Sequence, residues 1–272
     1  MIELHHATLA NGVRLLVGRA PHAGTCCVAV FVRWGSANES PRLSGIGHVL
    51  EHMAFKGTSV AGPGGQPRLR DARQVNLEAE RLGAEVNAHT DKDHTAFYMR
   101  GLPEHAEGML RMLAEIVLHP SLPAAELERE RQVLLQEFAE DEDDPVATAF
   151  KLLDKASFGL HPAAQPVMGT RRNLERFTRE DLVAHRAAGY LAGQVVVGVT
   201  GDVQPEAIER VVEDAFAALP PGAVAPVPEP SWRGEILTRA LVGSSQSHLA
   251  LAFPVSSRRV DDPAAAVGAA VL

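Results

Sequence analysis

Two histidines and one glutamate lie within five residues of this sequence. His48, Glu51 and His52 occupy positions i, i+3 and i+4, and this spacing places their side chains on one face of an α-helix. Two imidazoles at i and i+4 can bind one tetrahedral metal ion, and the carboxylate between them can take a proton from a metal-bound water. The segment therefore predicts a metal centre that activates water.

The residues around this motif favour a buried helix. Residues 44–47 read as a loop that enters the helix, and residues 56–57 fit its end. The helix also carries apolar residues at Ile46, Val49, Leu50 and Met53. The alternative is a core helix whose two histidines are hydrogen-bonded and hold no metal. We favour the metal centre, because burying two imidazoles and a carboxylate on one helix face without a cation would be costly.

A third protein ligand must come from elsewhere in the chain, because a catalytic zinc usually has three protein ligands and one water. The best candidates lie in a helix predicted over residues 124–140. Glu130 and Glu137 are seven residues apart and share one stripe of that helix with Leu127 and Leu134. A carboxylate on an apolar stripe needs a cation or hydrogen-bond donors. Both glutamates are therefore candidates for the metal centre.

Together these residues resemble the pitrilysin/insulinase family of zinc peptidases (peptidase family M16), near its bacterial branch that is similar to the mitochondrial processing peptidase. That family carries His-x-x-Glu-His, the inverzincin signature, followed far downstream by Glu-x6-Glu. The resemblance implies that Zn²⁺ is held by His48, His52 and Glu137. It also implies catalytic roles for two glutamates. Glu51 acts as the general base, and Glu130 orients a ligand or tunes the site.

A second resemblance concerns substrate binding. Residues 83–90 are similar to the family's Gly-x-x-x-Asn-Ala-x-Thr strand, which in relatives is an exposed edge that pairs with the substrate backbone. The resemblance implies substrate-binding roles for Asn87, Ala88 and His89. His89 replaces the usual aromatic residue, and Asp93 stands where relatives often have Glu. Both departures affect specificity more than chemistry.

The elements that must position these residues follow from periodicity and turn signals. We expect a hairpin of residues 4–9 and 13–17 around Asn11-Gly12, because Asn-Gly favours a tight turn. The other strands are expected at 26–34, 85–90, 94–100 and 194–200, and the helices at 71–82, 104–118, 124–140, 145–157, 179–188 and 205–219. The Gly- and Pro-rich residues 59–67 predict an inserted loop. The order predicts an α+β fold, with helices packed on a mainly antiparallel sheet.

The sequence also predicts an order of domains. We expect a catalytic zinc peptidase domain at residues 1–219, a Pro-rich linker at 220–232, and the beginning of a second, inactive homologous domain at 233–272. Residues 247–253 echo residues 25–31, and residues 267–272 echo the metal helix with Ala270 in place of His48. By resemblance to family subunits, we expect a truncated second domain. Completion would come from a second M16-type domain or from a homo- or hetero-oligomer.

Composition excludes several classes of partner. The formal net charge is −8 and no basic stripe is visible, so we expect no nucleic acid. No apolar run reaches membrane-spanning length, and the N-terminus has no signal sequence, so we expect no membrane and a cytoplasmic location. Cys26 and Cys27 are adjacent and point to opposite faces of a strand, which predicts free thiols.

The function predicted from these residues is zinc-dependent endopeptidase activity on peptides or unfolded segments. One alternative is a non-catalytic peptide-binding or scaffold subunit of an M16-type complex. Another is the processing of a peptide precursor in cofactor biosynthesis, which uses the same chemistry on another substrate. The presence of all five motif residues favours an enzyme.

Overall fold

The protein is described by a computed structural model that covers residues 2–62, 66–243, 245–255, 263–264 and 267–268. It confirms the predicted α+β class. A six-stranded sheet has the order β1-β2-β8-β3-β7-β6, and only the β2–β8 pair is parallel among its five pairings. The strands are β1 (Glu3–Thr8), β2 (Arg14–Arg19), β3 (Cys26–Val32), β6 (Glu85–Thr90), β7 (Thr95–Gly101) and β8 (Val195–Gly201).

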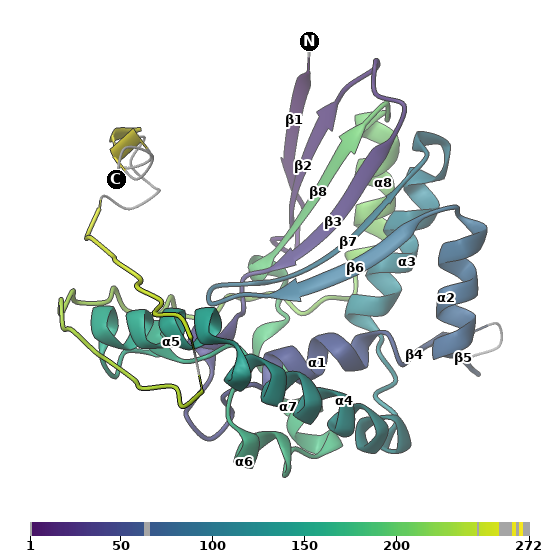
Figure 1. Ribbon diagram of the computed structural model, residues 1–272. Helices are drawn as coiled ribbons and strands as arrows, with labels where there is room; N and C mark the ends of the chain where they lie inside the picture. Colours follow the sequence, from purple (N-terminus) through teal and green to yellow (C-terminus); the bar gives the residue numbers. More distant parts are fainter. Residues whose placement is uncertain (1, 63–65, 244, 256–262, 265–266, 269–272) are drawn as a thin grey trace.

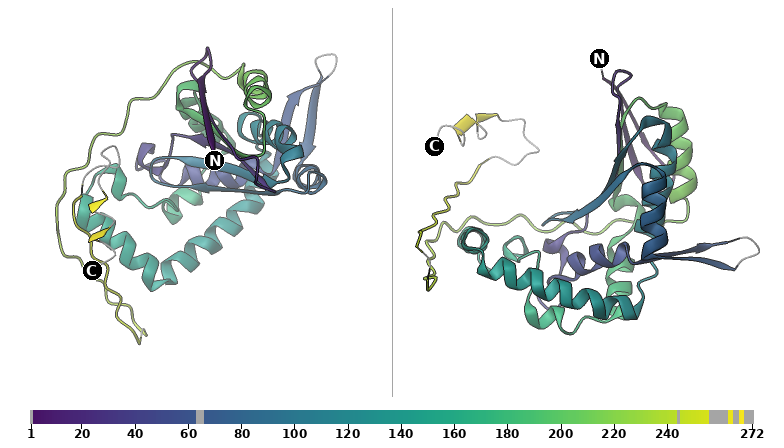
Figure 2. Two further views of the ribbon diagram at one scale, coloured as in Figure 1. Left: turned by 90° about the horizontal axis from the view of Figure 1, so that it is seen from above. Right: turned by 45° about the vertical axis from the view of Figure 1, so that its right-hand side comes forward.

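One face of the sheet carries the main core. The helices α3 (Ala106–Leu118) and α8 (Pro205–Phe216) lie against this face (Figure 1), where α3 contacts β3 and β7 and α8 contacts β2. Val28, Val30 and Val32 of β3 are fully buried, as the alternation of a strand with one covered face requires. Figure 2 shows no helix of the described chain over the opposite face.

A second group of helices gathers at one end of the sheet (Figure 1). They are α1 (Ile46–Ala54), α4 (Ala124–Asp143), α5 (Pro145–Phe158), α6 (Arg171–Leu174) and α7 (Arg179–Gly189). The helix α1 packs against α4, α7 and strand β6. It is thus held between the sheet edge and the long helix that carries the predicted third ligand. The four-residue helix α6 had no counterpart among the predicted elements.

The start of α1 is fixed by a buried carboxylate. Glu39 accepts backbone hydrogen bonds from Gly45 at 2.7 Å and from Gly47 at 2.8 Å. These donors belong to the first turn of the helix, whose N–H groups have no intrahelical partner. Burial raises the pKa of Glu39 to about 8, although both hydrogen bonds oppose the rise. Gly45 has a φ of +97°, a conformation that favours glycine.

The loop predicted over residues 59–67 is wrong at its two ends, because residues 59–61 and 67 belong to strands. β4 (Gly57–Ala61) and β5 (Pro67–Asp71) form an antiparallel two-stranded sheet that projects from the body (Figure 2). The carboxylate of Glu115 anchors this hairpin. It accepts from Thr58 at 2.5 Å and forms an ion pair with Arg68 at 3.2 Å. Asp71 then caps α2 (Ala72–Arg81) by accepting from the backbone of Gln74.

The C-terminal part of the chain agrees with the predictions in one respect and differs from them in another. The chain from residue 220 to 243 is extended and forms neither helix nor strand, as the Pro-rich composition predicts. Residues 247–253, which echo residues 25–31 in sequence, do not form a strand like β3 within the described residues 245–255. Leu249, Leu251 and Phe253 are 83%, 69% and 63% exposed, because no described strand pairs with this segment. The predicted counterpart of His48, Ala270, lies outside the described residues.

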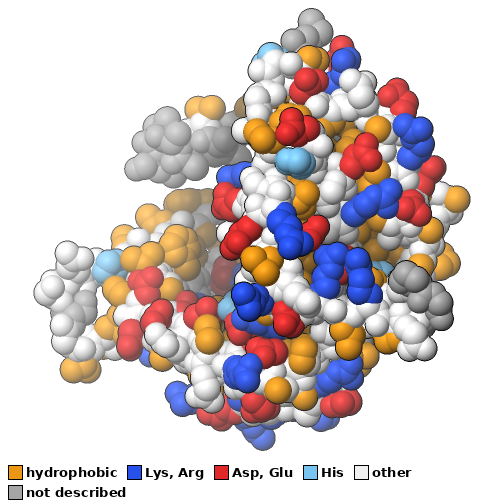
Figure 3. All heavy atoms as spheres, turned by 90° about the vertical axis from the view of Figure 1, so that its right-hand side faces the viewer, with side chains coloured by type: hydrophobic (Ala, Val, Ile, Leu, Met, Phe, Trp, Pro, Cys, Tyr) orange, Lys and Arg blue, Asp and Glu red, His pale blue; other side chains and the backbone are white. Residues whose placement is uncertain are grey.

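The distribution of charged side chains on the surface agrees with a sequence that has no basic stripe. Figure 3 shows Lys and Arg side chains interspersed with Asp and Glu on the face that it presents, without a continuous basic stripe. None of the helices in the described part of the chain is both long and apolar enough to cross a membrane. The two cysteines are free, with Cys26 buried, and burial raises the pKa of its thiol to about 11. That thiol is therefore protonated at neutral pH.

Candidate metal centre

The helix α1 brings His48, Glu51 and His52 to one face, as the spacing predicts. The Nε2 atoms of the two histidines lie 3.1 Å apart, and their rings are edge-on at 81°. Burial, and to a lesser extent the neighbouring His52, lower the pKa of His48 to about 4. A neutral imidazole has a free lone pair, which is the form that binds a metal ion.

The helix α4 supplies the third candidate ligand. Oε2 of Glu137 lies 3.5 Å from Nε2 of His52 and 3.8 Å from Nε2 of His48. Ligand atoms about 2.0–2.1 Å from a tetrahedral zinc ion are about 3.3 Å from one another. The three separations of 3.1, 3.5 and 3.8 Å bracket this value. The two imidazoles and the carboxylate therefore fit one zinc ion, with a fourth position left for water.

Glu130 contacts His52, one of the candidate ligands, rather than the candidate metal position. Its Oε1 lies 3.0 Å from Nδ1 of His52, and its Oε2 lies 2.6 Å from Nζ of Lys56. Burial raises the pKa of Glu130, but the hydrogen bonds from Lys56 and His52 outweigh burial and hold the pKa below its ordinary value. The ionised carboxylate accepts the Nδ1 proton of His52, which leaves the Nε2 lone pair facing the metal position.

Glu51 is not one of the three candidate ligands, and its hydrogen-bond partner is a residue of β6. The hydroxyl of Thr90, the last residue of β6, donates to Oε2 of Glu51 at 2.6 Å. Burial raises the pKa of Glu51, although the hydrogen bond from Thr90 opposes the rise. A raised pKa makes a carboxylate a better proton acceptor at neutral pH. Glu51 is thus fixed in position and suited to exchange a proton with a water at the centre.

Two residues of this site were missed in the sequence. Lys56 was interpreted only as a helix stop, and Thr90 only as the end of a strand. Lys56 lies four residues after His52, just beyond the end of α1, and both side chains contact Glu130. That spacing was the available signal for Lys56. For Thr90, the signal was its place in the Asn-Ala-x-Thr segment.

The predicted substrate residues lie on an edge strand. β6 is the last strand of the sheet, and it pairs only with β7 within the described chain. The backbone N–H of Ala88 donates to the side chain of Asn87 at 2.8 Å, and His89 approaches His94, with 3.2 Å between their Nε2 atoms. One side of β6 thus offers backbone groups to a partner. The binding of a substrate by these residues remains a prediction.

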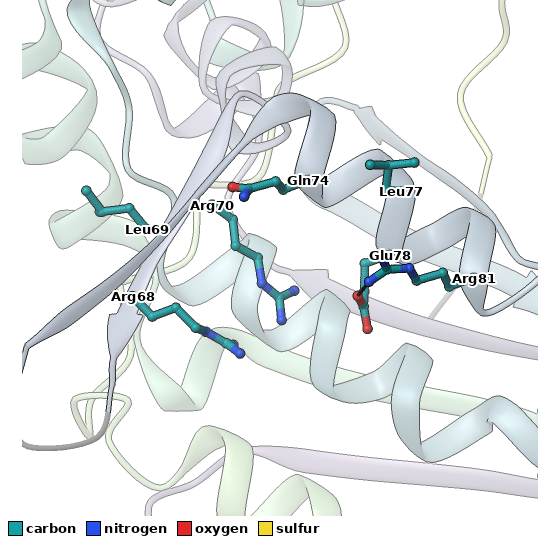
Figure 4. A pocket seen from close by; sticks show the side chains of 7 residues that line it. All are labelled: Arg68, Leu69, Arg70, Gln74, Leu77, Glu78 and Arg81. Atoms are coloured by element: carbon teal, nitrogen blue, oxygen red, sulfur yellow. Dashed lines mark ion pairs between the residues drawn. The ribbon is translucent and has the colours of Figure 1, made fainter.

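Two cavities lie away from the metal centre. One, of about 550 Å³, lies between the linker residues 224–230 and the turn after β6 and is open to solvent. The other, of about 540 Å³, lies between β5 and α2 (Figure 4). It is lined by Arg68, Leu69, Arg70, Gln74, Leu77, Glu78 and Arg81. Neither cavity includes a residue of the metal centre.

Comparison with known proteins gives consistent matches over most of the chain. Residues 14–171 match the family described as Insulinase (Peptidase family M16), and residues 176–272 match Peptidase M16 inactive domain. An uncharacterized zinc protease, YmxG of Bacillus subtilis, is 32% identical over 246 residues, which are 90% of this chain and 58% of that protein. The probable mitochondrial-processing peptidase subunit beta of Schizosaccharomyces pombe is 32% identical over 79% of this chain and 45% of its own length.

Further matches include a subunit of a mitochondrial complex and a solved structure. Subunit 1 of the mitochondrial cytochrome b-c1 complex of Rattus norvegicus is 31% identical over 80% of this chain and 43% of that protein. A crystal structure described as the peptidase M16 inactive domain from Pseudomonas fluorescens superposes with a TM-score of 0.75 at 26% identity, covering 84% of this chain and 54% of that one. The chain spans about half the length of the relatives that it matches.

The two matched regions meet inside one sheet. The second begins at residue 176, yet β8 lies after that point and pairs with β2 and β3 of the first region. The helix α8 also packs against β2 and α3. The predicted boundary at residues 219 and 220 falls instead where regular structure ends, and as a division between homologous domains it remains a prediction.

Proposed function

Because the chain belongs to the insulinase family of peptidases (peptidase family M16), we propose that it is a zinc-dependent endopeptidase acting on peptides or unfolded segments. The observation that carries this proposal is the convergence of His48, His52 and Glu137 from α1 and α4. Glu51 lies close enough to His52 and Glu137 to interact with them electrostatically. The donor types and their separations suit one zinc ion with a water in the fourth position.

In the proposed mechanism each residue has a separate role. Bound Zn²⁺ would supply Lewis acidity, which lowers the pKa of a ligated water and polarises the scissile carbonyl. Glu51 takes the proton of that water during attack on the carbonyl and returns it to the leaving amine. The hydrogen bond from Thr90 holds the Glu51 carboxylate in place. Glu130 holds His52 in the tautomer whose Nε2 is free to bind.

The edge strand β6 provides the proposed peptide site. An extended peptide adding to β6 would pair with free backbone groups around Asn87, Ala88 and His89. The strand ends at Thr90, which donates to Glu51, so the added peptide would pass beside the general base. Backbone pairing of this kind fixes the geometry of the peptide while giving little sequence selectivity.

The second candidate function is a non-catalytic peptide-binding or scaffold subunit. It is favoured by one comparison, because a relative of similar identity bears the name of a cytochrome b-c1 complex subunit. For either function we propose that a second M16-type domain or another chain completes the site. The exposed residues Leu249, Leu251 and Phe253 support this, since apolar side chains of this size are usually covered.

Cleavage of an unfolded peptide, measured together with zinc content, separates the two functions. The proteins compared are the wild type, Glu51→Gln, and Glu107→Gln as a matched control on the exposed face of α3. We expect one zinc per chain at the proposed catalytic centre in all three. We expect kcat/KM to fall by about 10²–10⁴-fold in Glu51→Gln only, because an amide cannot accept the water proton. Zinc-loaded wild type that does not cleave even when the completing domain or chain is supplied would favour the scaffold function, and a fully active Glu51→Gln would exclude Glu51 as the base.

A further inference from the structure

A second pair of histidines lies where β6 turns into β7. The Nε2 atoms of His89 and His94 are 3.2 Å apart, and their rings are edge-on at 86°. The His48–His52 pair of the metal centre has Nε2 atoms 3.1 Å apart and rings at 81°. The two pairs thus share the Nε2 separation and the ring angle, although their ring centroids are 4.6 Å and 5.3 Å apart. The first pair lies along a helix, and the second spans a strand end and a turn.

A carboxylate orients one histidine of the second pair, as in the first. Oδ1 of Asp93 lies 2.6 Å from Nδ1 of His94. A carboxylate accepts, so the Nδ1 nitrogen carries the proton and the Nε2 nitrogen of His94 presents a lone pair to His89. Carboxylates that accept from the outer nitrogen of a histidine are the usual support of a metal-binding imidazole.

The turn also provides negative charge for a cation. Asp91, Asp93 and His94 each offer one ligand atom, and these atoms lie within 4.8 Å of one another. Lys92, the cation in the same turn, is directed elsewhere: its Nζ donates to Asp154 at 2.7 Å and to the backbone of Gln165 at 2.8 Å. Asp91, Asp93 and His89 are exposed, so an ion can reach this cluster from solvent.

We propose that His89 and His94 form a second metal site, one that takes a divalent cation of the imidazole-binding class such as Zn²⁺, Cu²⁺ or Ni²⁺. Two nitrogens about 2.0–2.1 Å from one ion are about 2.9–3.4 Å apart in the common geometries, and 3.2 Å lies in that range. The metal-free alternative is a hydrogen bond from His89 to His94. Both arrangements keep Asp93 as the acceptor, and metal binding distinguishes them.

The site has a defined relation to the proposed peptide path. His89 belongs to β6 and lies close enough to Glu51 to influence its carboxylate electrostatically. An ion on His89 and His94 would therefore lie along the strand that we propose for peptide binding, distinct from the three ligands of the first centre. Its binding does not depend on whether the chain cleaves peptides.

The test is equilibrium dialysis of the whole chain against Zn²⁺, and separately against Ni²⁺, with metal analysis of the dialysed protein. We expect two ions per chain in the wild type and one in both His89→Phe and His94→Gln. The matched control is His105→Gln, a histidine 3.7 Å from the adjacent Glu104 that lacks a second imidazole partner in the described structure; it should retain two. We expect Asp93→Asn to weaken the second site by about 10–100-fold.

A variant of the first centre keeps the two sites distinguishable. In His48→Gln the second site alone remains, and zinc should still shift the imidazole ¹⁵N resonances of His89 and His94. That ion would be retained even if the proposed peptidase activity were absent. The inference is overturned if His48→Gln binds no ion, or if the second ion persists in both His89→Phe and His94→Gln. Either result assigns the pair to a simple hydrogen bond.

Discussion

His52 and Glu130 join helices α1 and α4 through a 3.0 Å contact between Nδ1 and Oε1. The glutamate side chain is only 9% exposed, and a carboxylate so placed needs compensation. Lys56, just beyond the end of the helix that carries the histidine, supplies it at 2.6 Å. The buried carboxylate of Glu130 thus orients His52, a proposed metal ligand. It also links α1, which carries His52, to α4, which carries Glu137.

The first prediction removes that orienting carboxylate. Glu130→Gln should lower zinc affinity by about 10–100-fold, because supporting groups around a metal ligand have effects of this size. Lys56→Met should lower it in the same direction, since Glu130 then loses its cation. Competition with a chromophoric chelator measures the affinity. The matched control is Glu128→Gln on the solvent side of α4, and an equal loss in that variant would contradict a specific role for Glu130.

The second prediction concerns the third ligand. Glu137→Gln should lose most of the zinc of the proposed catalytic centre at concentrations that saturate the wild type, because an amide oxygen is a weaker ligand than a carboxylate for this ion. Metal analysis after dialysis gives the occupancy. Glu140→Gln, one turn further along α4, serves as the control. If the Glu137→Gln variant retained full zinc occupancy, Glu137 would have to be removed from the ligand set.

The sequence predicted the part of the site that is local. His48, Glu51 and His52 fall within five residues, so helix geometry alone places them together. The contact of Thr90 with Glu51 joins residues 39 positions apart, and it depends on where β6 ends relative to α1. No local pattern gives that position. Resemblance to a family supplied Glu137, which spacing left open beside Glu130.

The errors in predicted elements also have a physical cause. Residues 59–67 contain the Gly and Pro of a loop, but the strands β4 and β5 depend on contacts of Thr58 and Arg68 with Glu115, which are distant in sequence. Residues 247–253 have the alternation of a strand, yet a strand forms only with a neighbour to pair with. Periodicity thus predicted the elements with a clear local pattern better than the elements that depend on contacts with residues distant in sequence.

The third prediction tests the edge strand. The N–H of Ala88 donates to the side chain of Asn87, which places it on the free side of β6, whereas the N–H of His89 points to β7, because these directions alternate along a strand. Ala88→Pro should therefore keep the fold and the zinc while raising KM for an unfolded peptide several-fold. His89→Pro should instead destabilise the sheet. An unchanged KM in folded, zinc-loaded Ala88→Pro would place the substrate elsewhere.

The last prediction is an acid-dependent loss of stability that originates at His185. Its side chain is buried on α7, and its Nε2 accepts from Nε1 of Trp34 at 2.9 Å. Burial lowers the pKa of His185 from 6.5 to about 4. The folded protein therefore resists protonation that the unfolded chain accepts. The stability that depends on a neutral His185 is therefore fully present above pH 6.5 and is lost as the pH falls towards 4.

Urea unfolding between about pH 7.5 and pH 4.5 measures this effect. The stability of the wild type should fall relative to that of His185→Gln by roughly 1–3 kcal/mol over this range, since each unit of pKa shift corresponds to about 1.4 kcal/mol. The difference between the two proteins isolates His185 from other acid-sensitive groups such as His48, which both proteins share. His105→Gln, at a partly exposed histidine, should follow the wild type. Parallel pH profiles for the wild type and His185→Gln would contradict the assignment, because a buried neutral histidine must be protonated on unfolding in acid.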